Sequence, residues 1–225
     1  MNPSLALGLI ALLLALQAVH CFRERGRRSM LLFFGLALIY ALMRELWITN
    51  HPRPFYTPGS LGVLNISPII ILGWPLHFYL ALWIARRLLR VDLRAERFRM
   101  APLALLAASA MLVLALPGEV IGSRLRWWIW QPDNLMDLGW YHGLPLNVLG
   151  GWMLTGGMFV LAFLLFEHQH PLRWANLGAL AGSIPFHTLT HPYLLMGLGL
   201  LAGYVAAAAW FLPRVTPEKI SLGST

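Results

Sequence analysis

Long apolar runs separated by short polar segments dominate the chain. The runs cover residues 4–22, 30–49, 65–85, 101–122, 143–166, 172–190 and 193–212. Each is close to the roughly 20 residues that an α-helix needs to cross a bilayer at about 1.5 Å per residue. The pattern predicts an all-α, polytopic membrane bundle of about seven transmembrane helices. These helices would form a single domain over residues 1–225, with no soluble domain. The run at 172–190 is the weakest, because polar residues and a proline interrupt it.

The composition and the placement of charge agree with this prediction. Hydrophobic residues make up 58% of the chain and charged residues only 12%, against about a quarter charged in soluble domains. With seven spans and the N-terminus outside, 13 of the 17 basic residues fall on the cytoplasmic side and three fall outside. Such a bias predicts a cytoplasmic C-terminus. The net charge of +8 is then explained by orientation and membrane lipids, and no nucleic acid partner is expected.

Two acidic residues lie inside the predicted spans, Glu45 and Glu119. An ionisable group in the hydrocarbon region costs about 3 kcal/mol or more, so both are candidate catalytic residues. A carboxyl group buried in an apolar pocket is suited to giving a proton to a nonpolar substrate. A purely structural role stays open for each: Glu45 could pair with Arg44 or Arg53, and Glu119 with Arg124 or with loop donors.

The surroundings of the two glutamates suggest a tandem repeat of helices 2–3 and 4–5. Each glutamate precedes a long outer loop, residues 50–64 or 123–142, and a span that carries a Gly-Trp pair. The pairs are Gly73-Trp74, after Glu45, and Gly151-Trp152, after Glu119. Repeats in membrane proteins tend to place a site at their interface. We therefore expect the two hairpins to share one outward-facing pocket, beneath the tryptophan-rich second loop.

The histidines and the single cysteine bear on possible cofactors. His168-x-His170 and His187-x₃-His191 suggest the histidine boxes of membrane metal enzymes, but the predicted topology separates the two pairs by a full span. No metal is expected; if one binds, its candidate ligands on the outer side are His51, His142, His187 and His191. Cys21 alone cannot build a thiolate site. Nucleotide, haem and HExxH motifs are absent from the sequence, so no cofactor is predicted.

One stretch resembles a known family. Trp128-Ile129-Trp130, followed by the segment from Trp140 to Trp152, is similar to the membrane carotenoid hydratases of the bisanhydrobacterioruberin hydratase type. The hairpin from Glu45 to Trp74, with Tyr56 and Pro68, also looks like that family, and the resemblance covers roughly residues 40–160. It implies water addition across a terminal double bond of a carotenoid, in a bacterial or archaeal plasma membrane. The candidate substrate-binding residues are Tyr56, Asn65, Trp74, Trp128, Trp130, Tyr141, His142, Asn147 and Trp152.

Chemistry and residues are consistent with that implication. Hydration of a trisubstituted alkene starts with protonation to a tertiary cation, which aromatic faces stabilise. Asn65, Asn147 or His142 could then deliver water. The same acids without water would make a terpene or carotenoid cyclase or isomerase. A lipid or small-solute transporter, a histidine-ligated metal oxidoreductase and a structural subunit are further alternatives. The expected partners are a lipophilic isoprenoid or other lipid substrate and the membrane lipids, while the sequence leaves the oligomeric state open.

Overall fold

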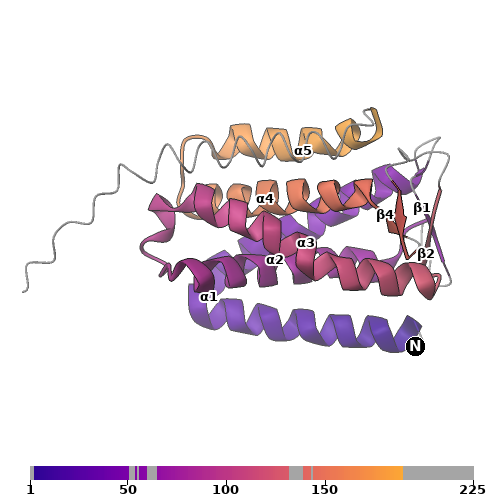
Figure 1. The fold of residues 1–225 in the computed structure, drawn as a ribbon. Coiled ribbons are helices and arrows are strands. Elements are labelled where there is room, and N and C mark those ends of the chain that lie inside the picture. The colour runs from indigo at the N-terminus through magenta and orange to yellow at the C-terminus, as the bar shows by residue number, and fades with distance from the viewer. Residues whose placement is uncertain are drawn as a thin grey trace, which may run out of the picture.

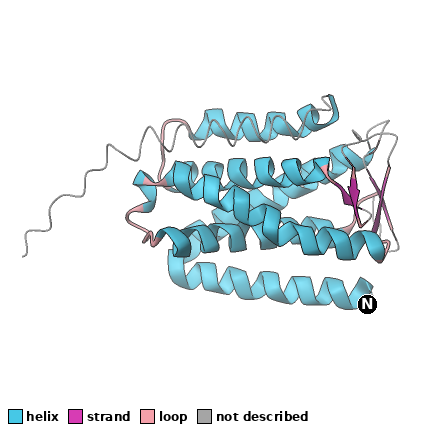
Figure 2. Cartoon of the chain, viewed as in Figure 1, coloured by secondary structure: helices cyan, strands magenta, loops and turns pink. Residues whose placement is uncertain are grey.

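The computed structural model describes residues 3–50, 54, 56–59, 65–131, 139–142 and 144–189, and helices form most of them (Figure 2). The helices are α1 (Pro3–Asn50), α2 (Pro68–Leu89), α3 (Met100–Arg124), α4 (Asn147–Glu167) and α5 (Arg173–Leu189), with a short 3-10 helix η1 (Glu96–Phe98). Within the described ranges, four helices are long and apolar enough to cross a membrane, namely α1, α2, α3 and α4. The protein is therefore a helical membrane protein.

Helix α1 contains the first two predicted spans. It is broken at Gly26, whose φ of 85° and ψ of 172° lie outside the helical region and are readily adopted only by glycine. The chain reverses there, so that the N-terminal arm (indigo) lies along one side of the bundle and the second arm returns behind α2 (Figure 1). The expected polar loop near residues 23–29 is replaced by helix on both sides of Gly26, because a single glycine is enough for the reversal.

Four of the five remaining expected spans correspond to single helices. The runs at 65–85, 101–122 and 143–166 become α2, α3 and α4, with ends shifted by a few residues. The run at 172–190 becomes α5, whose 17 residues would rise about 26 Å along a helix axis. The run at 193–212 lies outside the described residues. The count of seven spans and the orientation in the membrane stay predictions.

Small residues let α3 and α4 approach closely. A Cβ added to Gly156 would come within 2.2 Å of Met111 Cγ, and one added to Gly157 within 3.1 Å of Ala108 Cβ. Small residues at helix contacts are the usual means of close packing in membranes, where no hydrophobic effect drives helices together. Between α2 and α4, Phe78 and Phe159 stack with ring centroids 4.0 Å apart. This packing fixes the faces that α2, α3 and α4 turn toward one another.

Two short antiparallel strand pairs close one end of the bundle, which we call the strand end (Figure 1). Strand β1 (Tyr56–Pro58) pairs with β2 (Trp128–Trp130), and β3 (Trp140–Tyr141) pairs with β4 (Leu144–Pro145). The first pair joins the two segments that the sequence predicted as long outer loops. Gly59 makes the approach possible, because a Cβ there would lie 2.0 Å from the carbonyl oxygen of Arg126.

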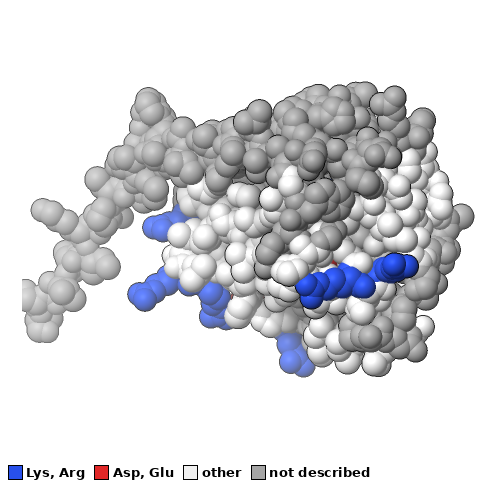
Figure 3. All heavy atoms as spheres, turned by 45° about the vertical axis from the view of Figure 1, so that its right-hand side comes forward, with Lys and Arg blue, Asp and Glu red and all other residues white. Residues whose placement is uncertain are grey.

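Three of the six described acidic side chains are buried. With the strand end turned forward, Figure 3 shows arginine side chains toward both ends of the molecule and, among the described residues, almost no acidic atoms on that face. The reason is burial: Glu45 and Glu96 are 0% exposed and Glu119 is 7% exposed. Buried carboxyl groups must be paired or neutral, so their partners define the two polar centres of the protein.

Candidate functional site

The two glutamates inside the predicted spans lie near the strand end of two different helices. Glu45 is on the second arm of α1, five residues before its end at Asn50, and Glu119 is on α3, five residues before its end at Arg124. Both are buried. The two carboxyl groups thus lie at corresponding positions near one end of the bundle, but their contacts differ in one important respect.

Glu45 is fully engaged by donors. Arg44 Nη1 lies 2.5 Å from Oε1, Trp74 Nε1 donates to the same oxygen at 2.8 Å, and the Tyr56 hydroxyl donates to Oε2. Burial, together with the adjoining carboxylate, raises the pKa of the Tyr56 hydroxyl well above its usual value. The hydroxyl therefore keeps its proton and remains a donor. A cation and two neutral donors stabilise Glu45 as a carboxylate.

Glu119 has a different set of partners. Trp152 Nε1 donates to Oε1 at 2.8 Å, and Trp128 also interacts with the carboxyl group, but Oε2 is buried and no described residue meets it with hydrogen-bond geometry. No described arginine, lysine or histidine forms an ion pair with it. A buried carboxyl group without a cation is held more favourably as the neutral acid. The two glutamates are therefore equivalent in their tryptophan contacts but not in their charge partners.

A pair of tryptophans connects the two carboxyl groups. The rings of Trp74, on α2, and Trp152, on α4, stack with centroids 3.9 Å apart and planes inclined by 21°. Each indole N–H is used by one glutamate, so the stack lies between them. The Arg44 guanidinium lies 4.5 Å from the Trp74 ring centroid. Hydrogen bonds, an ion pair and ring stacking thus connect Glu45 and Arg44 to Glu119 through the two indoles.

A small apolar cavity of about 140 Å³ adjoins Glu119. Its wall includes three tryptophans, Trp127, Trp128 and Trp152, and one histidine, His77. The remaining lining is Ile10, Ile69, Ile70, Gly73, Leu76, Ala115 and Gly118. For scale, an engineered apolar cavity of about 150 Å³ binds benzene. The cavity therefore fits one short hydrocarbon group, surrounded by aromatic faces and beside a buried acid.

Gly122 positions one wall of this cavity. The Trp128 indole passes over it so closely that an added Cβ would lie 2.1 Å from the ring. We expect Gly122→Ala to push this indole out of place. The rate of the reaction catalysed at this cavity should then fall about tenfold or more, because a displacement near 1 Å at a reacting site can cost about a hundredfold. Gly35→Ala, in the second arm of α1, is the matched control, since a Cβ there meets nothing within 4 Å and Gly35 does not line the cavity. Equal activity of the two variants would contradict this role for Trp128.

The predicted substrate-binding residues divide into two groups. Four of them contact a glutamate or line the cavity, namely Tyr56, Trp74, Trp128 and Trp152. Trp130 is in β2, where its Nε1 donates to Ser123 Oγ at 3.0 Å. Asn65 is exposed and lies three residues before α2 begins. His142 is also exposed, and its Nδ1 lies 2.6 Å from Arg124 Nη2. The side chains of Tyr141 and Asn147 lie outside the described ones. His77 was not among the predicted site residues, because nothing in its local sequence indicates which face of α2 borders a cavity.

The predicted alternative metal ligands do not come together within the described residues. His51 and His191, and the side chain of His187, lie outside them, and His142 contacts Arg124. A different cluster, Glu96, Glu167 and His168, has donor atoms within 4.8 Å of one another at the end opposite the strands.

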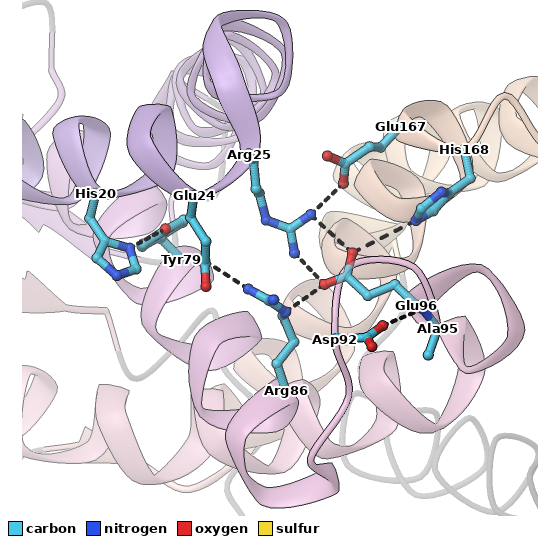
Figure 4. A network of polar contacts seen from close by, with 10 residues as sticks. All are labelled: His20, Glu24, Arg25, Tyr79, Arg86, Asp92, Ala95, Glu96, Glu167 and His168. Carbon is cyan, nitrogen blue, oxygen red and sulfur yellow. Dashed lines mark hydrogen bonds and ion pairs between the residues drawn. The ribbon is translucent and has the colours of Figure 1, made fainter.

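Arginines already occupy the carboxyl groups of that cluster (Figure 4). Arg25 pairs with Glu96 and, at 2.6 Å, with Glu167, while Arg86 pairs with Glu96 at 2.6 Å and Glu24 at 2.7 Å. The network joins α1, α2, η1 and α4. Removing one partner of a buried ion pair typically costs about 3–5 kcal/mol, so these carboxyl groups are committed to pairs that link the four elements.

The fold and the site define a helical membrane protein with two buried carboxyl groups, one of which, that of Glu119, borders an aromatic, apolar cavity. The family model described as carotenoid biosynthesis protein matches residues 5–212. Because the match covers most of the chain, the protein belongs to the carotenoid biosynthesis protein family and has a role in carotenoid metabolism. No curated protein and no solved structure matches the chain.

Proposed function

We propose that this protein is an enzyme that adds water to a terminal carbon–carbon double bond of an acyclic carotenoid or related polyene. The observation that carries the proposal is the Glu119 carboxyl group, which is buried, lacks a cation partner among the described residues and borders an apolar cavity. Such a group can act as the general acid that protonates an unactivated alkene.

The cavity supports hydration of a chain end. Protonation of a trisubstituted terminal double bond gives a tertiary cation, and the faces of Trp127, Trp128 and Trp152 line the space in which that cation would form. The volume of about 140 Å³ suits one terminal isoprene unit, since a benzene-sized group fills a cavity of about 150 Å³. Cyclisation would require at least two units folded together, so the size favours hydration over the cyclase alternative.

Glu45 takes a separate role in this proposal. Its pairing with Arg44 keeps it ionised, and its hydrogen bond holds Trp74 against Trp152. Trp152 in turn donates to Glu119. Glu45 therefore positions the stacked tryptophans and contributes negative charge near the cation, while Glu119 supplies the proton.

The two hairpins would form the proposed tandem repeat. In support, Tyr56 pairs with Trp130 across β1 and β2, and each of these residues follows its glutamate by 11 positions. In both halves the glutamate accepts a 2.8 Å hydrogen bond from the tryptophan of the next helix. Pairing between these two equivalent residues supports a repeat relation between the halves.

The test is to express the chain in bacteria that accumulate an acyclic carotenoid and to analyse the pigments by chromatography and mass spectrometry. We expect a product heavier by one water per modified end, with the oxygen label recovered from ¹⁸O-enriched water. Cells with an empty vector are the control. A product of unchanged mass with a new ring would favour the cyclase, and unchanged pigments across linear and cyclic carotenoids would reject both functions.

A further inference from the structure

His77 is the second ionisable group at the cavity that holds Glu119. It lies on α2, whereas Glu119 lies on α3, and both line the same space. The His77 ring is 5.6 Å from the Trp152 ring, and Trp152 is the hydrogen-bond donor to Glu119. Apart from these two residues and the indoles, the lining is hydrocarbon or glycine. A chain end bound beside Glu119 would therefore have the imidazole as its other polar neighbour.

The tautomer of His77 follows from one hydrogen bond. Nδ1 lies 2.6 Å from the carbonyl oxygen of Gly73, one turn earlier on α2. A carbonyl oxygen can only accept, so Nδ1 carries the proton, and in a neutral imidazole Nε2 then carries the lone pair. The carbonyl of Leu114, on α3, also interacts with the ring.

Resting on the hydratase function proposed above, we propose that His77 is the general base that accepts a proton from the attacking water. Glu119 gives its proton to the less substituted carbon of the terminal double bond. The π electrons of that double bond form the new C–H bond. The tertiary cation left on the dimethyl carbon is attacked by water, forming the C–O bond. The O–H proton passes to His77 Nε2 and then returns to the Glu119 carboxylate, so that one water is consumed and both side chains are restored.

The residues that the sequence suggested for water delivery do not line this cavity. Asn65 is exposed near the strands, and His142 is exposed and contacts Arg124. The side chain of Asn147 lies outside the described ones. Among the described residues, His77 is thus the polar group whose position matches the step that follows protonation.

The experiment separates proton donation from water capture. Membranes containing the full chain are incubated in D₂O with an acyclic carotenoid, and both the hydrated product and the recovered substrate are analysed for deuterium. In His77→Phe and His77→Gln we expect hydration to fall at least about a hundredfold, the usual scale of general-base catalysis. Exchange of deuterium into the terminal group of the recovered substrate should persist within about tenfold of the wild-type rate, because Glu119 still forms the cation.

Each other outcome has a distinct meaning. Unchanged hydration in both variants overturns the role of His77. Loss of hydration and exchange together, in variants present at wild-type levels and with wild-type melting temperature, also overturns it, because His77 would then only shape the cavity. If the wild-type chain neither hydrates nor exchanges any polyene, the hydratase function itself fails. A variant that is poorly folded is replaced by His77→Asn, to which the same criteria apply.

Discussion

Glu119→Gln is expected to abolish water addition, with a loss of about a thousandfold or more. Glutamine has nearly the same shape and keeps an oxygen that can accept from Trp152 Nε1, which now donates at 2.8 Å, so the fold should be retained. The amide, however, cannot give up a proton to an alkene, and a positioned general acid typically contributes about 10²–10⁴-fold. The measurement is the initial rate of hydrated carotenoid formation in membranes with matched protein levels.

Two further variants sharpen that result. Glu119→Asp keeps the acid but shortens its reach, so we expect partial activity, reduced by about a hundredfold. Asp92→Asn makes the same change in an exposed carboxyl group at the opposite end of the bundle, keeps an oxygen that can accept from the Ala95 N–H, and should leave the rate unchanged. Wild-type rates for Glu119→Gln would show that another group donates the proton and would remove Glu119 from the mechanism.

Arg44→Gln is expected to destabilise the protein by about 3–5 kcal/mol, the usual cost of leaving a buried charge without its partner. Glu45 is 0% exposed and its cationic partner is Arg44, 2.5 Å away. For a chain of this size the loss corresponds to about 10 °C in melting temperature. Thermal unfolding in detergent, followed by loss of helical signal, measures it. The double variant Arg44→Gln/Glu45→Gln removes both charges and should recover most of the stability.

The same pair distinguishes the roles of the two glutamates. If Glu45 positions Trp74 and supplies negative charge, the double variant should fold well yet hydrate more slowly than the wild type, by about tenfold to a hundredfold. It should remain faster than Glu119→Gln. A stable Arg44→Gln protein would mean that Glu45 is neutral in the native state, and the proposed asymmetry between the two carboxyl groups would be wrong.

Much of the candidate site could be predicted from the sequence because a charge inside a long apolar run is conspicuous. Hydropathy alone identified Glu45 and Glu119, and the matching Gly-Trp pairs singled out Trp74 and Trp152, which do contact the two glutamates. The apolar runs also corresponded to helices α2, α3, α4 and α5. These features depend on residue type and spacing along one helix, which a sequence states directly.

Three features depended on the tertiary structure. The reversal of α1 at Gly26 requires a backbone conformation that a glycine permits but does not impose. The ion-pair network of Arg25, Glu96 and Glu167 joins residues up to 142 positions apart. The cavity beside Glu119 collects side chains from α1, α2, α3, α4 and the segment that leads into β2. Each depends on how helices are rotated and packed against one another, and hydropathy along the chain carries little information on that.

The difference between the two glutamates illustrates the division most clearly. By itself, the sequence determined that two acids lie in apolar helices at similar positions, each ahead of a Gly-Trp pair, and it left a charge partner open for both. The tertiary structure decided that Glu45 pairs with Arg44 and Tyr56, whereas Glu119 Oε2 has no described partner with hydrogen-bond geometry and borders the cavity with His77. The physical reason is that the energy of a buried carboxyl group depends on donors and charges within a few ångströms, and packing alone determines which those are.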